Sequence, residues 1–424
     1  MQLSSLTRRL FLITLLVMTF RNFQFFPGMA MVQEAWFLLC FIFLLTVYPF
    51  LKGRTQWRFS SFELYLLAMM LLVPLLSAVS AWREFGQPIV YGILSQRGVT
   101  LFAGVLLLIH GLRYQIFTLR DVEKSLLFLA WGTLILYLIM KTLLDPAMFA
   151  SYGKGFVAGG DGDHPSFKLP GIFIIFGIYY YLFLGFRKKQ GKYYLIAGLF
   201  FIFLLGDAGG RSMTVAMLAT FVFFVYRWGG VSRLIALLPK MLVVITLFLG
   251  IAYVANPESV SSRVEKFSDA FTVAFTGNEV EDVSANARIL ETLIAMPYVQ
   301  KNPLLGNGNI SNQWQDGYEG VLGGYFYPSD IGIIGVLYMY GVVGFILFAW
   351  QYWFAIREAN RLPIQIHNPM LDATKGCLLY LAIHSLVTGF FVHNAEISFL
   401  FIALLGSIVR DLRASCHPNM VLSN

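Results

Sequence analysis

Long apolar runs alternate with short charged or turn-rich breaks along the whole chain. A membrane-spanning helix needs about 20 mostly apolar residues, and several runs reach or approach that length. We place twelve runs at 10–26, 35–51, 62–80, 89–109, 122–144, 169–186, 193–206, 212–226, 234–254, 331–355, 376–392 and 396–409. The pattern predicts an all-α polytopic membrane protein with about 12 transmembrane helices.

One connection of about 75 residues interrupts this alternation. We therefore expect transmembrane helices 1–9 in residues 1–254, a large outer loop in 255–330, and transmembrane helices 10–12 with a short tail in 331–424. From Val260 to Phe275, apolar residues recur at helical spacing, which predicts an amphipathic helix on the membrane surface or on the loop's own core. A second loop helix is expected from Ser284, as its N-cap, to Lys301.

Basic residues in alternate connections indicate the orientation. One face of the predicted topology has 20 Lys and Arg residues against six acidic ones. Because basic loops stay on the cytoplasmic side, both termini are expected in the cytoplasm and the large loop outside. The formal net charge of +8 is thus a signal of topology, and we expect no nucleic-acid partner.

Composition excludes an ordinary soluble protein. Hydrophobic residues make up 58% of the chain and charged residues 13%, against about 45–50% and 25% in soluble domains. The cysteines Cys40, Cys377 and Cys416 are too scattered for a disulfide framework or a zinc site. We expect no metal and no cofactor.

A basic, glycine-rich break joins two unusually short apolar runs. It reads Gly206-Asp207-Ala208-Gly209-Gly210-Arg211-Ser212. Runs of about 14 residues do not comfortably cross about 30 Å of hydrocarbon, so the break is expected in a water-filled cavity. Arg211 and Ser212 would open the next helix, where a helix N-terminus and a guanidinium favour anions. The alternative is an Asp207–Arg211 ion pair at a tight hairpin.

Other charged residues are weaker candidates for substrate binding. Arg288 lies on the second loop helix, where an arginine is usually a solvated residue. Arg97, within the fourth apolar run, either faces the protein interior or marks a later helix start at Gly98.

Candidate bases are few. Asp330 stands where the loop re-enters the membrane, and it either accepts a proton or caps the following helix. Weaker candidates are Glu319, Asp316 and His164, the last in a polar loop. His393 occupies a separate outer turn, and His110, His367, His384 and His417 are expected toward the cytoplasmic half, away from this set.

The end of the large loop mixes aromatic and acidic residues. Trp314 and Tyr325 lie close in sequence to Asp316 and Glu319. Such a mixture can stack on sugar rings and hydrogen-bond to them, but Trp and Tyr are also common at membrane interfaces. We therefore keep Trp314 and Tyr325 as candidate substrate-binding residues.

Three stretches in the second half of the chain complete the pattern. They are Gly209-Gly210-Arg211-Ser212; Asn286-Ala287-Arg288 through Asn302-Pro303-Leu304-Leu305-Gly306-Asn307-Gly308; and Gly332-Ile333-Ile334-Gly335 through Tyr340-Gly341-Val342-Val343-Gly344. Together with the architecture, they resemble the bacterial O-antigen ligases and polysaccharide polymerases. Arg211 and Arg288 look like the family's two essential arginines. The resemblance implies that they bind the diphosphate of an undecaprenyl-diphosphate-linked saccharide.

The resemblance also implies a cellular setting. The protein would be a GT-C-like glycosyltransferase of the bacterial inner membrane, with its active site on the periplasmic side. A chain-length regulator and a flippase are the implied protein partners.

One departure from the family favours polymerisation. Ligases that transfer O-antigen to lipid A core usually have a His-Asn pair just before the span after the loop, where this chain has Tyr327-Pro328-Ser329-Asp330. A polymerase that joins one lipid-linked repeat unit to another therefore fits better. A ligase remains the alternative, and a lipid-linked glycan flippase is the alternative from another class, since broken helices at a substrate site are typical of transporters.

Overall fold

The computed structural model describes most of the chain. The described residues are 4–20, 29–42, 59–145, 157–158, 166–167, 171–204, 211–255, 283–362 and 368–416, with the single residues 257, 261, 265 and 268. Apart from three of these single residues, the amphipathic helix predicted from Val260 to Phe275 lies outside this part of the chain, as does the loop around His164.

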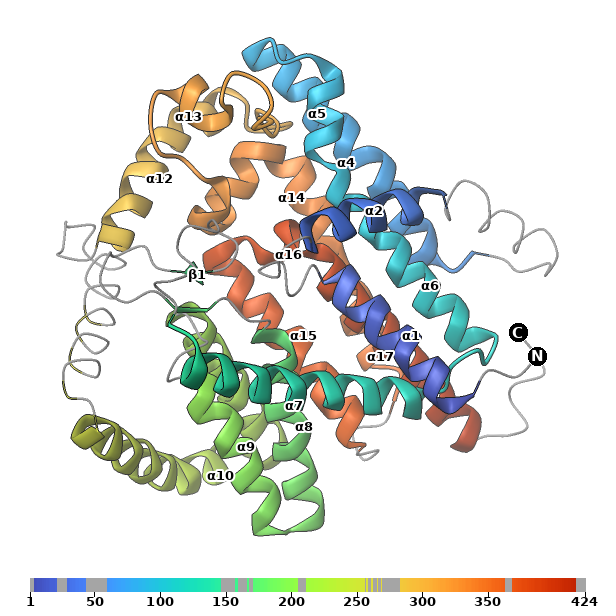
Figure 1. Cartoon of the computed structure of the whole chain (residues 1–424), viewed down its shortest axis with the longest axis vertical. Helices are drawn as coiled ribbons and strands as arrows, with labels where there is room; N and C mark the ends of the chain where they lie inside the picture. The colour runs from blue at the N-terminus through green and yellow to red at the C-terminus, as the bar shows by residue number, and fades with distance from the viewer. Residues whose placement is uncertain are drawn as a thin grey trace.

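The described chain is helical apart from one short hairpin (Figure 1). The N-terminal helices are α1 (Ser5–Thr19), α2 (Met29–Ile42), α4 (Ser61–Phe85), α5 (Ile89–Ser95), the 3-10 helix η2 (Arg97–Leu101), α6 (Phe102–Arg113) and α7 (Leu119–Leu143). Then follow β1 (Val157–Ala158), β2 (Ser166–Phe167), α8 (Gly171–Lys188), α9 (Gly191–Phe203) and α10 (Arg211–Ala255). The two strands pair antiparallel, with Val157 opposite Phe167.

The remaining elements form the outer loop and the C-terminal helices. They are α12 (Val283–Lys301), α13 (Gly317–Leu322), the 3-10 helix η5 (Pro328–Ile331), α14 (Gly332–Ala359), α15 (Pro369–Thr388), α16 (Phe390–His393) and α17 (Ala395–Cys416). The predicted loop helix ends at Lys301 as expected. It begins at Val283, so Ser284 lies in its first turn and is not its N-cap.

Each predicted apolar run contains helix, but the expected count of twelve spans is not shown. Within the described residues, five helices are long and apolar enough to cross a membrane. A sixth span is counted if α5 and the following 97–113 segment, bent by 44°, are taken together. The protein is therefore a multi-pass, all-helical membrane protein. Several other runs form short helices, such as α1 with 15 residues and α9 with 13, below the roughly 20 that a span needs.

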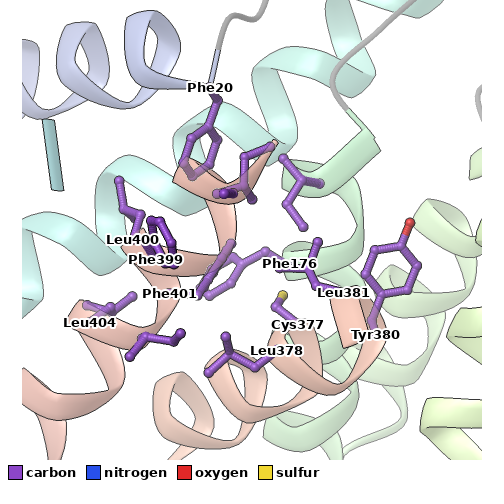
Figure 2. Close-up of a cluster of buried hydrophobic side chains, with 14 of the residues drawn as sticks. Phe20, Phe176, Cys377, Leu378, Tyr380, Leu381, Phe399, Leu400, Phe401 and Leu404 are labelled. Carbon is purple, nitrogen blue, oxygen red and sulfur yellow. The ribbon is translucent and has the colours of Figure 1, made fainter. Parts of the chain in front are cut away.

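The hydrophobic core lies where α8, α15 and α17 meet the end of α1. Figure 2 shows Phe176 from α8 among Cys377 and Leu381 from α15 and Phe401 from α17. The rings of Phe176 and Phe401 lie 6.2 Å apart, and both side chains are fully buried. This packing fixes α15, whose far end reaches the candidate site.

Charged helix ends collect at one end of the bundle. Arg8 of α1 pairs with Asp121 of α7 at 3.3 Å, and Arg113 of α6 pairs with Glu63 of α4 at 3.4 Å. The Arg413 Nε atom of α17 donates to the Arg361 carbonyl beyond α14 at 3.1 Å. The elements α12 and α13 lie at another side of the molecule, where α12 packs against α14 (Figure 1). We call the end of the bundle that holds Arg8, Arg113 and Arg413 the basic end.

The turn after α12 fills a break in α14. At Gly341 the backbone of α14 leaves the helical conformation, with φ 61°. The turn and the broken helix exchange backbone hydrogen bonds there. The Val342 N–H of α14 donates to the Pro303 carbonyl of the turn at 2.8 Å, and the Asn307 N–H of the turn donates to the Tyr338 carbonyl of α14 at 2.7 Å. The backbone groups freed by the break are thus satisfied inside the protein, as membrane depth requires.

Two glycines permit this contact. Gly306 and Gly341 both have positive φ, and a Cβ atom on Gly306 would lie 2.6 Å from the Gly341 nitrogen. A side chain on Gly341 would in turn collide with the Leu304 carbonyl. The two glycine-containing motifs of the sequence, around Gly306 and around Gly341, therefore pack against each other. We call this contact the joint, and it holds the C-terminal end of α12 against α14.

Candidate functional site

Arg288 and Asp330 are brought together by α12 and η5. The element η5 packs against both α12 and α14, so the end of the outer loop lies along the helix that holds Arg288. Glu291, one turn after Arg288 and 1% exposed, interacts electrostatically with both Arg288 and Asp330. The Glu291 Oε1 atom accepts a hydrogen bond from the Tyr327 backbone N–H at 3.0 Å, which ties the loop to α12.

The environment of Glu291 favours its neutral form. Burial, reinforced by the negative charge of Asp330, raises the pKa of the Glu291 carboxyl from 4.5 to about 7. The Tyr327 hydrogen bond and the positive charge of Arg288 act in the opposite direction but do not cancel the effect. Near neutral pH, Glu291 can therefore gain or lose a proton beside a cation and a second carboxyl group.

Tyr325 lies near the same side chains, and we call Arg288, Glu291, Asp330 and Tyr325 the Arg288 group. Its side chain is 54% exposed, and its ring lies 4.9 Å from that of Tyr327 in an edge-to-face arrangement. Burial of the hydroxyl and the negative charges of Asp330 and Glu291 raise the pKa of Tyr325. An exposed aromatic face next to carboxyl groups is suited to contact with a sugar ring.

Asp330 does not cap the following helix. Ile331 is the N-cap residue of α14, and no side chain bonds to the free N–H groups there. Asp330 lies within η5, half-buried, and its Oδ1 atom accepts from the Ser329 hydroxyl at 3.1 Å. The capping interpretation was therefore wrong.

The start of α10 contacts α15, and α15 in turn contacts the chain next to Asp330. Arg211 is the first residue of α10, while its side chain and residues 205–210 lie outside the described part of the chain. The next residue, Ser212, lies 3.3 Å from His384 of α15, measured from Oγ to Nε2. One turn later, the Leu386 and Val387 carbonyls of α15 lie against Gly332, two residues after Asp330.

The C-terminal turn of α15 thus joins the helix start at Arg211 to the element that holds Asp330. This arrangement corrects one expectation, because His384 was placed away from the candidate set and in fact contacts Ser212. Glu291 was missed altogether. The signal that could have found it is its spacing from Arg288, since residues i and i+3 share one face of a helix.

Comparison with known protein families gives a match for the part of the chain that contains these residues. Residues 193–349 match the sequence model of the O-antigen ligase family. These residues form a domain of the O-antigen ligase family, named here the O-antigen ligase domain after that family. No match was found among curated proteins or among solved structures. The family consists of glycan-transferring enzymes that act on lipid-linked substrates, and the domain contains Arg211, Ser212, Arg288, Glu291 and Asp330.

The O-antigen ligase domain shares a second polar region with helices outside it. Arg97 opens η2, and its Nη2 atom pairs with Glu34 of α2 at 2.6 Å. Arg97 and Glu34 line a cavity of about 460 Å³, together with Asn309 and Tyr340 of the domain and with His393 and Glu396 from beyond it. Arg97 therefore does not join the Arg288 group directly.

Trp314 serves the packing of the O-antigen ligase domain. Its side chain is half-buried and packs against the hydrophobic core, which also contains the edge-to-face pair of Tyr318 and Phe326, 5.5 Å apart. The exposed Asp316 and Glu319 lie on or beside α13, and neither shows an electrostatic link to Glu291. Across the described residues, no three His, Cys, Asp or Glu side chains gather as a metal site would require.

Proposed function

We propose that the protein is a polysaccharide polymerase that transfers an undecaprenyl-diphosphate-linked glycan onto a second lipid-linked repeat unit. The observation that supports this most strongly is the grouping of Arg288, Glu291 and Asp330 beside the end of α15, which also contacts the start of α10. A cation for the leaving group and a carboxylate for the attacking group would then stand at one place.

In the proposed reaction, a hydroxyl oxygen of the acceptor sugar attacks the anomeric carbon of the donor. The bond between that carbon and the diphosphate oxygen breaks, so undecaprenyl diphosphate leaves with the electron pair. Arg211 and Arg288 bind the diphosphate and stabilise the charge that develops on it, more strongly in the transition state than in the ground state. No step requires a metal.

The hydroxyl proton goes to Asp330. A positioned general base contributes typically about 10²–10⁴-fold to the rate. In this proposal the positive charge of Arg288 lies beside the carboxyl pair, and Glu291, whose pKa is raised to about 7, can hold a proton. Ser212, at the start of α10, adds a hydroxyl near the diphosphate.

The saccharide would extend from this group toward the outer surface. We assign Tyr325 to stacking on the sugar next to the reacting bond. We keep Arg97 as a substrate-binding residue through the cavity that it shares with Asn309 and His393, whose polar lining suits sugar hydroxyls. Trp314 would act on the substrate only indirectly, through the shape of the loop.

The proposed location is the bacterial inner membrane, with both termini and the basic end in the cytoplasm. The Arg288 group would then lie on the periplasmic side, where lipid-linked repeat units are extended. A flippase that delivers these units and a chain-length regulator are the proposed protein partners.

Deletion of the gene in its host, followed by gel analysis of surface polysaccharide, tests the proposal. A polymerase predicts loss of long chains while core with a single repeat unit remains, or accumulation of lipid-linked single units if the polymer is not core-linked. Complementation with wild type restores the polymer, whereas Arg211→Ala and Arg288→Ala at equal expression do not. Bare core with accumulated lipid-linked polymer would instead identify a ligase, and lack of any outward lipid-linked units a flippase.

A further inference from the structure

The basic end of the bundle contains a cavity that the proposed reaction does not use. Its volume is about 400 Å³, and it lies between the first turn of α4 and the last turns of α6, α14 and α17. Six charged side chains line it: Arg113, Arg357, Glu358, Arg361, Arg410 and Arg413.

Positive charge in this cavity is only partly neutralised. Glu358 pairs with Arg357 at 3.2 Å and with Arg361 at 2.8 Å, so one carboxylate serves two guanidinium groups. Arg410 repels Arg113 electrostatically, and no carboxylate among the described residues pairs with Arg410. Two positive charges that repel each other destabilise this arrangement unless an anion binds to both.

The cavity lies at the depth of lipid headgroups. Trp350 and Trp353 of α14 are 50% and 47% exposed, and exposed tryptophans on membrane helices mark the interface. The guanidinium of Arg357 lies 4.9 Å from the centre of the Trp353 ring. The arginines are thus one helical turn beyond the aromatic belt, on the side of the polar headgroups.

The cavity wall is also partly apolar. Phe59, Phe62, Phe354 and Ile402 line it beside the arginines. A site for a soluble anion has no need of such a wall, whereas a phospholipid presents a phosphate next to its glycerol and acyl chains. Basic pockets between transmembrane helices on the cytoplasmic side are suited to anionic headgroups.

We propose that this cavity binds the phosphate-bearing headgroup of an anionic phospholipid from the adjoining leaflet. Arg410 and Arg113 would contact the phosphate, while the aromatic wall contacts the glycerol region. The bound lipid would join α4, α6, α14 and α17 at the basic end, so it would stabilise the bundle far from the Arg288 group.

Native mass spectrometry of the purified full-length protein tests the proposal. Titration with phosphatidylglycerol is compared with phosphatidylcholine of the same acyl chains. We expect tighter retention of phosphatidylglycerol, and Arg410→Gln is expected to weaken it about fivefold, as the loss of one basic residue at an anionic surface predicts. Phosphatidylcholine binding should not change.

Two further variants distinguish a binding role from a structural one. Arg410→Lys keeps the charge and should retain most of the preference, while Arg120→Gln removes an exposed arginine of the same end outside the cavity and should behave as wild type. Equal retention of the two lipids, or equal effects of Arg410→Gln and Arg120→Gln, would overturn the proposal. So would saturable binding of inorganic diphosphate without any phosphatidylglycerol preference, because the site would then serve a soluble anion.

Discussion

At the scale of single residues, burial and the neighbouring charge of Asp330 raise the pKa of the Glu291 carboxyl. The sequence singles out Arg288, Asp330 and Tyr325 as candidates because each lies in a stretch with a recognisable pattern. Glu291 could have been added from its spacing to Arg288, but its burial and its hydrogen bond from Tyr327, which is 36 residues away, could not be predicted. His384 was misplaced for a similar reason, because only the packing of α15 on α10 brings it to Ser212.

Replacement of Glu291 by Gln should change how stability depends on pH. The pKa of Glu291 is about 7 in the folded protein and 4.5 ordinarily, so the folded state holds its proton more tightly. Stability from this group is fully present below pH 4.5 and is lost as the pH rises through 7. We expect the Tm of the wild type to fall between pH 5 and pH 8 more steeply than that of Glu291→Gln in the same detergent.

Gln can still accept the Tyr327 hydrogen bond, so the loop should keep its place in this variant. Glu319→Gln is the matched control, because Glu319 is exposed on α13 and should leave the pH dependence of the wild type intact. Parallel Tm profiles for wild type and Glu291→Gln would show that Glu291 does not titrate in this range.

At the scale of elements, the joint between the turn after α12 and the break in α14 positions the site. The sequence predicts the end of α12 at Lys301 and the glycine-rich turn after it, because Pro303 and the glycines stop a helix. It does not reveal the break at Gly341, since α14 is apolar on both sides of that residue. The break becomes visible only with its partner turn, which supplies the missing backbone hydrogen bonds.

Gly341→Ala should damage both the fold and the reaction. The positive φ costs a residue with a side chain about 1–3 kcal/mol, and the new methyl group would also displace the Leu304 carbonyl. We expect a Tm lower by several degrees and a reduced rate of polymerisation, since α12 would shift with its turn. Thermal unfolding and product analysis on equal amounts of protein measure the two effects.

Gly132→Ala is the control for this substitution. Gly132 lies inside α7, and a methyl group added there would meet no neighbouring side chain or other helix within 4 Å. Alanine is also the better helix former by up to about 1 kcal/mol. The Tm of this variant should stay the same or rise. If Gly341→Ala behaved like Gly132→Ala, the joint would not be a constraint on the fold.

At the scale of the whole molecule, the helical class could be predicted, whereas the expected count of twelve spans is not shown within the described residues. Hydropathy finds apolar runs, but it does not tell a helix that crosses the bilayer from a shorter one packed among its neighbours. Where full spans were expected, α1 and α9 form helices of 15 and 13 residues, while the run at 89–109 forms the bent α5 and α6 segment, which counts as one span if it is taken together. The collection of basic residues at one end was foreseen, and the contacts of Arg8, Arg113 and Arg413 follow it.

Labelling of introduced cysteines tests the proposed orientation. Arg120 at the basic end and Glu319 on α13 are both exposed, and the native Cys40 and Cys377 are buried. In a Cys416→Ser background, Glu319→Cys should react with a membrane-impermeant maleimide in cells with an opened outer membrane. Arg120→Cys should react only after the inner membrane is also permeabilised, and the reverse pattern would place the Arg288 group in the cytoplasm.

Glycan transfer by the purified protein in liposomes is the most direct test of the central claim. Lipid-linked repeat units are supplied as the sole glycan, and products are followed by gel and by released undecaprenyl diphosphate. We predict a ladder of longer glycans with one diphosphate released per linkage, and at least a 10²-fold slower reaction for Arg288→Ala, as for the loss of one transition-state donor. Arg120→Ala should match the wild type. A wild-type protein that leaves single units unchanged, or an Arg288→Ala variant that extends them at the normal rate, would contradict the account.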